Sequence, residues 1–392
     1  MGTTEDQTVA AGHSVEVHPA RWQAGLDELL GGVARRFPRV EPRRRAKALV
    51  LGLLSELPRK NCWTLAEHAG DANPDGMQHL LARAVWDHDG VRDDLRAYVV
   101  EHLGDPQAVL VIDETGDLKK GTATARVQRQ YTGTAGRIEN AQVAVYLVYA
   151  TDAGHALVDR ELYLPKGWTC DPDRCQAAGI PDQVEFATKP ALASRMLTRA
   201  LDAGVPAAWV AGDEVYGACP ALRAWLEARG IGYVLAVACD HLVRIGSGTQ
   251  RADALLRQVP ARAWQQVLCG KGAKGHRWYD WAFIAWTPVA LTMAASTGSW
   301  SAATATASAA SWPSSAAGCP ARCHWAPWSG SRAGAGPSRS VSRPARAWSA
   351  WTSIRSAAGA PGTAGSPWRC SPTPSWWSLR WPTAPGTRHR PG

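Results

Sequence analysis

The stretch AVLVID, residues 108–113, is a short apolar run that ends in an acid. A run of this length between polar segments is typical of a strand that is buried on both faces. Two further runs follow, QVAVYLVYAT at 142–151 and ALVDRELYLP at 156–165, and the turn-forming residues 152–154 separate them. The pair predicts a β-hairpin beside the first strand.

Helices and strands alternate after this hairpin. Segment 189–204 predicts a helix, with Thr188 as its cap and Pro190 in its first turn. A strand at 207–214, a helix at 219–230 and a strand at 232–238 complete the order β-β-β-α-β-α-β. A doubly wound parallel sheet needs a helix after nearly every strand, so this order favours an α/β fold with an RNase H-like mixed sheet.

The chain divides into three parts by pattern and composition. Residues 1–104 carry apolar side chains at helical spacing and predict a helical N-terminal domain. A helix pair separated by the turn Asn-Pro-Asp-Gly is either a DNA-binding helix pair or an ordinary helical hairpin. Residues 105–288 hold the predicted sheet, and the composition changes abruptly after Pro288.

Residues 289–392 contain no Asp, Glu, Lys, Asn, Gln, Phe or Tyr, and the last acid of the chain is Asp280. This tail has 10 Arg, so it accounts for the whole formal net charge of +9 and leaves −1 for the rest. The positive net charge of the whole chain therefore does not indicate a nucleic-acid or membrane partner for residues 1–288. We expect the tail to lack a native fold.

Two acids stand at the ends of strands that the predicted order makes neighbours. Asp113 follows the first strand and Asp213 the fourth, so both carboxylates should emerge at one edge of the sheet. Carboxylates are ligands that Mg²⁺ prefers, and a pair of such ions activates and stabilises oxygens in phosphoryl transfer. An acid after an apolar strand also often just caps the next turn. Glu114 and Glu214 should point away from the metal face, because alternate strand residues face opposite ways.

Several long motifs occur in order around these acids: VIDETGDLKKG (111–121), VQRQYTGTAGRIENAQVAVYLVYA (127–150), LPKGWTCDPDRCQAAGIP (164–181), VEFATKP (184–190) and WVAGDEVYG (209–217). They resemble the catalytic segments of actinobacterial insertion-sequence transposases of the DDE class, and the resemblance runs from about residue 20 to Trp286. It implies an RNase H-like fold with three acids that bind two Mg²⁺ ions and cut and join DNA strands. Asp113 matches the first aspartate of the family and Asp213 the second.

The resemblance also implies DNA as partner, both the terminal repeats of the element and the target, and leaves a homodimer open. Five basic residues near the first motif are candidates for binding DNA phosphates, although a solvated strand edge explains them equally well. They are Lys119, Lys120, Arg126, Arg129 and Arg137.

The third acid of the family is missing. It belongs to a pattern of Arg, three residues, Glu, six residues and Lys, and no acid follows Asp280. The reading frame can be shifted by building each new codon from the third base of one codon and the first two bases of the next. In this frame, permitted codon choices restore the pattern within 334–355, and the codon of the glutamate spans those of Ser338 and Arg339. We infer a shift of the reading frame near residues 288–292, and therefore a catalytically impaired chain.

Other interpretations stay open. The tail is alternatively a genuine disordered segment rich in Ser, Pro and Arg, although its 10 Trp are unusual for such a segment. The chain is alternatively a DNA-binding remnant that occupies element ends, or a structure-selective nuclease. Nine scattered Cys, no apolar run of membrane length and no secretory signal favour a cytoplasmic protein.

The frame shift is testable on the encoding DNA. Sequencing across codons 285–295 and reading on in the shifted frame should reveal an open frame that contains the Arg, Glu and Lys pattern. A stop codon in that frame before the pattern, or another residue in place of the glutamate, would contradict the interpretation.

Overall fold

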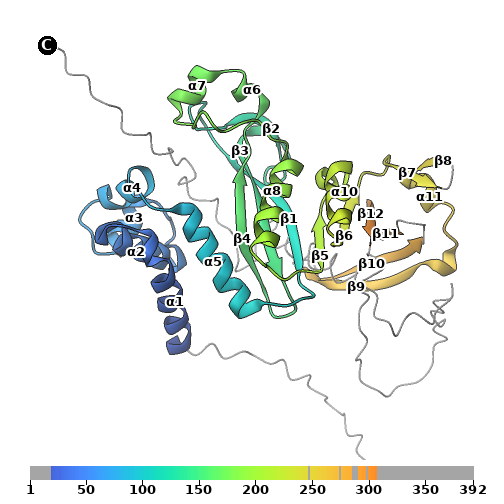
Figure 1. The fold of residues 1–392 in the computed structure, drawn as a ribbon, viewed down its shortest axis with the longest axis horizontal. Coiled ribbons are helices and arrows are strands. Elements are labelled where there is room, and N and C mark those ends of the chain that lie inside the picture. The colour runs from blue at the N-terminus through green and yellow to red at the C-terminus, as the bar shows by residue number, and fades with distance from the viewer. Residues whose placement is uncertain (1–18, 246–247, 273–274, 285–289, 297–298, 307–392) are drawn as a thin grey trace, which may run out of the picture.

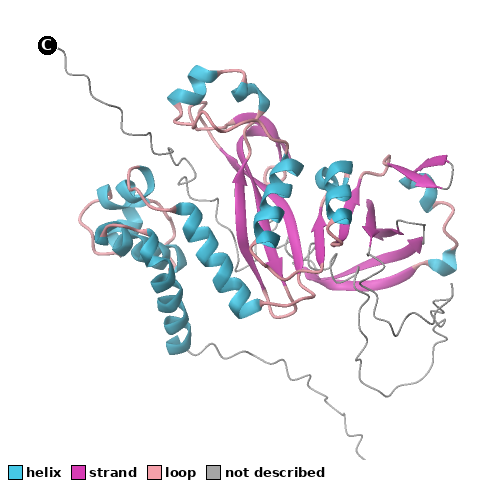
Figure 2. Cartoon of the chain, in the orientation of Figure 1, coloured by secondary structure: helices cyan, strands magenta, loops and turns pink. Residues whose placement is uncertain are grey.

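The computed structural model describes residues 19–245, 248–272, 275–284, 290–296 and 299–306, in which a group of helices precedes a large mixed sheet (Figures 1 and 2). The predicted helical start is confirmed. Its elements are α1 (Pro19–Val33), a 3-10 turn (Ala34–Arg36), α2 (Val40–Leu54), α3 (Cys62–His68), α4 (Asp75–Ala82) and α5 (His88–Leu103).

The first helices pack around a small core of their own, which includes Phe37, Leu49, Leu65 and Met77. The side chain of Asn61 accepts hydrogen bonds from the backbone N–H groups of Trp63 and Thr64, and so caps α3. The predicted helix, turn and helix at this point are therefore present as α3 and α4.

The sheet begins with β1 (Val109–Leu118), β2 (Gln128–Thr132), β3 (Arg137–Ala150) and β4 (His155–Leu162). The apolar runs predicted three of these strands, β1, β3 and β4, and did not predict β2. After the short helices α6 (Lys166–Thr169) and α7 (Pro172–Ala177) come α8 (Lys189–Asp202), β5 (Trp209–Gly212), α9 (Glu214–Gly217), α10 (Pro220–Ala228) and β6 (Gly232–Val237).

The strand directions confirm the mixed sheet. β3 lies between β4 and β1 and is antiparallel to both, whereas β1, β5 and β6 run parallel. Helix α8 packs against β3 and β4, and α10 against β6 and α8 (Figure 1). Fully buried side chains such as Leu110, Leu147, Leu197 and Leu235 form the core between helices and sheet.

One strand is longer than its apolar run. The prediction ended the first strand at Asp113, but β1 continues to Leu118 through polar residues, because β3 pairs with it along its whole length. Asp113 therefore lies within β1, opposite Tyr146.

The later part of the sheet differs from the prediction at the tail. After β7 (Leu242–Ile245), β8 (Gly248–Arg251), α11 (Ala252–Leu256) and a 3-10 turn (Ala261–Ala263), the sheet contains β9 (Gln265–Gly272), β10 (Gly275–Ile284), β11 (Ala290–Ser296) and β12 (Ser299–Thr306). The prediction gave residues 289–392 no native fold, whereas β12 pairs with β6 and β11 with β10. Threonine favours strands, and β6 offers an edge with backbone groups to pair. Residues 307–392 lie outside the described residues.

In the described part of the chain no helix combines the length and the apolar character needed to cross a membrane.

Leu110 tests the packing of β1. It is completely buried, so Leu110→Ala should lower the free energy of unfolding by about 2–5 kcal/mol in urea titrations. Leu118→Ala is the matched control, because that side chain of the same strand is 51 % exposed, and it should change the value by less than about 1 kcal/mol. Equal losses in the two variants would contradict the placement of β1.

Candidate metal centre

The register of two parallel strands brings Asp113 and Asp213 together. Ile112 of β1 pairs with Gly212 of β5, the last residue of that strand, so each aspartate directly follows a paired residue. Neighbouring strands lie about 4.8 Å apart, and the two carboxylates are therefore neighbours. The prediction that these acids share one edge agrees with the geometry.

Each aspartate is oriented by a nearby backbone group. Oδ1 of Asp213 accepts a hydrogen bond of 2.9 Å from the N–H of Val215 and so caps α9. Oδ1 of Asp113 accepts one of 2.8 Å from the N–H of Glu114. Asp213 is buried and Asp113 is partly exposed, so the pair lies at the border between core and solvent.

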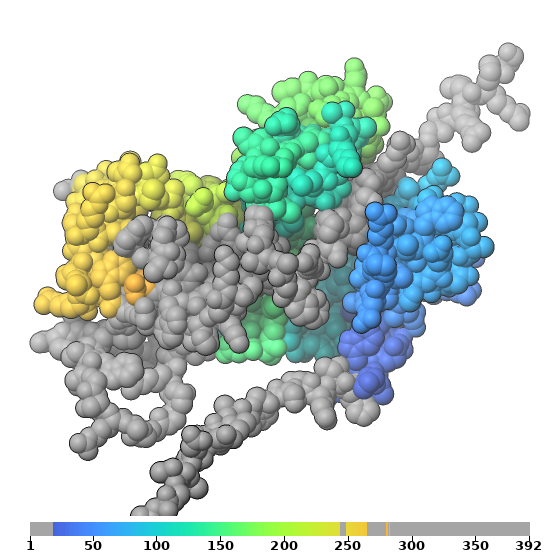
Figure 3. Space-filling model, turned by 180° about the vertical axis from the view of Figure 1, so that it is seen from behind, coloured from blue at the N-terminus to red at the C-terminus, as the bar shows by residue number. Residues whose placement is uncertain are grey.

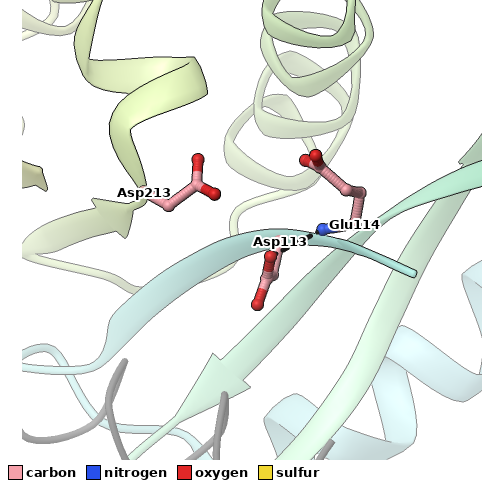
Figure 4. A group of neighbouring side chains, drawn as sticks. All are labelled: Asp113, Glu114 and Asp213. Carbon is pink, nitrogen blue, oxygen red and sulfur yellow. Dashed lines mark hydrogen bonds between the residues drawn. The ribbon is translucent and has the colours of Figure 1, made fainter. Parts of the chain in front are cut away.

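Glu114 lies beside the two aspartates, although alternation was expected to point it away from the metal face. Figure 4 shows Asp113 and Glu114 leaving β1 in different directions, as alternation requires. Nevertheless one carboxylate oxygen from each of Asp113, Glu114 and Asp213 lies within 4.8 Å of the others. Asp213 is the cap of α9 rather than a strand residue, and α9 packs against α8 on the side where Glu114 lies. Glu214 is exposed and outside this cluster.

Two residues that sequence reasoning missed hold the Glu114 carboxylate. The amino group of Lys189 lies 2.7 Å from Oε1, and the hydroxyl of Tyr216 donates a hydrogen bond of 2.7 Å to Oε2. Both residues lie in motifs that the sequence displays, Lys189 in VEFATKP and Tyr216 in WVAGDEVYG. Their contacts with Glu114 could not be predicted from the sequence, because they form only when β1, α8 and α9 pack together.

Lys189 supplies the positive charge nearest to Glu114. It begins α8, where the helix dipole disfavours a cation, and Thr188 caps the same helix as predicted. The ion pair with Glu114 offsets that cost, since both side chains are about four-fifths buried. Its charge also reduces the repulsion among the three carboxylates.

Tyr216 is completely buried beneath the acids. Burial, followed by the negative charge of Glu114, raises the pKa of the Tyr216 hydroxyl well above its usual value, and Asp213 and Asp113 add to the effect. The hydroxyl therefore keeps its proton and remains a hydrogen-bond donor to Glu114.

The five predicted DNA-binding residues lie in different environments. Lys120, Arg129 and Arg137 are exposed, whereas Lys119 is mostly buried and paired with Asp117. Arg129 and Arg137 lie on the β2–β3 hairpin, which together with α6 and α7 projects from the molecule (Figures 1 and 3). This hairpin also exposes Tyr131, with 63 % of its surface in contact with solvent.

Arg126 is different from the others, because it is only 4 % exposed. It donates a hydrogen bond to the carbonyl of Leu162, and in the part of the chain that the structure describes its Nε has no hydrogen-bond partner. The φ of Arg126 is +65°, a left-handed conformation that a side chain disfavours. A phosphate on the outer surface is out of reach of this guanidinium.

Substitution of Tyr216 tests how Glu114 is held. Tyr216→Phe should lower the free energy of unfolding at pH 8 by about 1.5–3 kcal/mol, because it removes a hydrogen bond to a charged group. The pKa of the Tyr216 hydroxyl is higher in the folded than in the unfolded state. Its contribution to the free energy of unfolding is therefore complete at pH values below the unfolded-state pKa of about 10, and it is lost as the pH rises through the folded-state pKa. The difference between the two proteins, measured by urea unfolding, should therefore shrink above pH 10.

Tyr131→Phe is the control, since this exposed tyrosine lies on the projecting hairpin. It should unfold like the wild type throughout the pH range. A Tyr216→Phe protein with the same stability as the control at pH 8 would rule out a stabilising hydrogen bond to Glu114.

The sequence of this chain is similar to those of known DNA-processing enzymes. Residues 33–278 match the family model described as DDE superfamily endonuclease. The chain is 30 % identical over 222 residues to a probable transposase for insertion sequence element IS701 from Microchaete diplosiphon, and the match covers 56 % of this chain and 55 % of that protein. The chain thus spans about half the length of this curated relative.

A solved structure, the cryo-EM structure of a piggyBac transposase synaptic complex with hairpin DNA, is also similar. The likeness covers 72 % of this chain and 60 % of that one, with 11 % identity and a TM-score of 0.35. The family match extends over more than half of the chain and includes both aspartates and Glu114. This chain belongs to the DDE superfamily endonuclease family.

Proposed function

We propose that this chain derives from the transposase of an insertion sequence and that Asp113 and Asp213 are its catalytic, metal-binding acids. The observation that carries the proposal is the juxtaposition of two carboxylates from parallel strands, joined by Glu114 within 4.8 Å. The relative from an insertion sequence, 30 % identical over 222 residues, supports the same function.

The donor set suits a hard divalent cation such as Mg²⁺. All three groups offer carboxylate oxygens, which Mg²⁺ prefers to nitrogen or sulfur ligands. When bound, two such ions would neutralise charge on the reacting phosphate and activate the attacking oxygen. Asp113 and Asp213 would hold them, and Lys189 and Tyr216 would keep Glu114 in place beside them.

The proposed reaction has two steps on DNA. Water first attacks the phosphodiester at an element end, and the bond to the leaving 3′-oxygen breaks. The freed 3′-hydroxyl then attacks a phosphodiester of the target. Its oxygen bonds to the target phosphorus, the bond from that phosphorus to the target's own 3′-oxygen breaks, and this oxygen leaves as a 3′-hydroxyl. Lys119, Lys120, Arg129 and Arg137 are proposed to bind backbone phosphates, of which Lys120, Arg129 and Arg137 are accessible in the structure.

We further propose that this chain is impaired in both steps. No acid follows Asp280, so the downstream glutamate of the family has no counterpart. Glu114 is proposed not to replace it, because Glu114 directly follows Asp113 on β1 and its negative charge is already compensated by the ammonium group of Lys189. The two aspartates then hold an incomplete set of ligands.

The missing acid also favours a second candidate function. A chain that keeps exposed basic side chains but lacks the third ligand is suited to bind element ends without cutting them. Such a remnant would compete with intact transposase for the same DNA.

Cleavage assays on two chains test the proposal. One is the present chain. The other, called the reframed chain, is encoded by a gene in which a base is inserted or deleted near codon 290, so that translation continues in the shifted frame. With Mg²⁺ and a duplex carrying the DNA that flanks the gene, the reframed chain should nick that duplex. The present chain should be slower by about 10²–10³-fold or more, because it lacks one group that stabilises the reacting charge.

Two aspartate variants of the reframed chain complete the design. Asp113→Asn and Asp213→Asn should each abolish nicking, whereas Asp182→Asn, an exposed acid outside the cluster, should leave it unchanged. Equal nicking by the two chains would overturn the impairment. Cleavage of branched DNA without regard to end sequence would instead identify a structure-selective nuclease, and sequence-specific binding without nicking by the reframed chain would identify the DNA-binding remnant.

A further inference from the structure

A cavity of about 1120 Å³ lies between the helical part of the chain and the sheet. Residues 81–92, at the end of α4 and the start of α5, form one wall, and β4, α8 and residues 176–187 form the others. Figure 1 shows α4 and α5 on one side of this junction and β4 and α8 on the other. None of the acids of the metal centre lines it.

The cavity has a marked excess of positive charge. Three carboxylates line it, those of Asp89, Glu161 and Glu185. Twice as many guanidinium groups do so, those of Arg83, Arg92, Arg126, Arg160, Arg195 and Arg199.

Three of these arginines are already paired. Arg199 lies 2.7 Å from Glu161 and 3.0 Å from the buried carboxylate of Asp159, and Arg92 lies 2.8 Å from Asp89. Arg160 approaches the same Asp89 at 3.5 Å. Within the described residues, Arg83, Arg126 and Arg195 form no ion pair, and Glu185 is the one lining carboxylate that likewise forms none, so unpaired positive charge remains in excess.

Arg126 is the decisive member of this set. Only 4 % of this residue is exposed, and among the described residues its Nε has no hydrogen-bond partner. Burial lowers the pKa of Arg126, with Glu161 acting in the opposite direction. A buried cation with an unused donor is costly unless an anion or acceptor approaches it. The cavity that it lines is where such a group can enter.

We propose that this cavity binds phosphate groups of a DNA strand, held by Arg83, Arg126 and Arg195. Guanidinium groups present several N–H donors in a planar fork that fits phosphate oxygens. The volume exceeds that needed for one phosphate and suits a nucleotide or a short stretch of strand. The choice of DNA as the source of the phosphate rests on the proposed function, whereas the anion site itself does not.

The position of the cavity is compatible with a strand that also reaches the metal centre. Arg160 pairs with Tyr146 across β4 and β3, and Tyr146 pairs with Asp113 across β3 and β1. Two strand spacings, about 10 Å, therefore separate the cavity wall from Asp113 in the sheet. Phosphates of one DNA strand advance by about 3.4 Å along the helix axis, so a phosphate some three nucleotides from the reacting one falls at this distance.

Inorganic phosphate tests the anion site without DNA. The melting temperature of the full chain should rise in sodium phosphate relative to sodium chloride of equal ionic strength, because a ligand of the folded state stabilises it. The double variant Arg83→Gln/Arg195→Gln changes exposed side chains and should lose this rise. The double variant Arg21→Gln/Arg257→Gln removes the same charge outside the cavity and should keep it.

A 20-base-pair duplex then tests the source of the phosphate. Its dissociation constant is measured by fluorescence anisotropy at several salt concentrations. If both arginines contact DNA, the slope of the logarithm of this constant against the logarithm of the salt concentration should be smaller by about two in the Arg83→Gln/Arg195→Gln variant than in the wild type. An equal phosphate response in all three proteins overturns the site. A lost phosphate response with an unchanged DNA slope overturns the DNA assignment and identifies free phosphate or a nucleotide as the ligand. If the wild type binds no DNA, the proposed function fails, and the phosphate response alone still decides the anion site.

Discussion

The parallel pairing of β1 with β5 is the constraint on which the centre depends. Four residue pairs join these strands, and the last of them, Ile112 with Gly212, fixes where each aspartate stands. A slip of one residue would turn the side chains of β5 to the opposite face of the sheet. The buried side chains of Leu110, Ile112 and Val210 make such a slip costly, because they fill the core beneath α8 and α10. The packing of apolar residues therefore sets the geometry of the acids.

A second layer of interactions fixes Glu114 beside the aspartates. Lys189 approaches from the start of α8 and Tyr216 from α9, so the carboxylate is held between two helices that follow different strands. The positive charge of Lys189 offsets part of the repulsion among three acids, and the protonated hydroxyl of Tyr216 adds a donor without adding charge. These two contacts hold the Glu114 carboxylate beside the aspartates.

The apolar runs predicted β1, β3, β4, β5 and β6 because these strands carry buried apolar residues, whereas the polar strand β2 was not predicted. The segment Glu114–Leu118 was not predicted as a strand, since its polar residues resemble a loop and its partners on β3 lie 23 to 31 positions away in the sequence. Arg126 was predicted among the basic residues that bind DNA phosphates, whereas it is buried, has a left-handed backbone and donates a hydrogen bond to the carbonyl of Leu162. The strands β11 and β12 were not predicted either, because the composition of the tail gives no apolar run, and their pairing depends on the edge of β6. The two aspartates could be predicted because each is an acidic residue at the end of an apolar run. The roles of Lys189 and Tyr216 could not, because they depend on contacts between elements that are distant in the sequence.

Binding of Mn²⁺ as a paramagnetic substitute for Mg²⁺, followed by electron paramagnetic resonance, is the most direct test that Asp113 and Asp213 share one centre. The wild-type chain should decrease the signal of free Mn²⁺ in a saturable manner, and Asp113→Asn and Asp213→Asn should each weaken this binding while Asp182→Asn should not. Unchanged Mn²⁺ affinity in both single variants would contradict a common centre built on these two carboxylates.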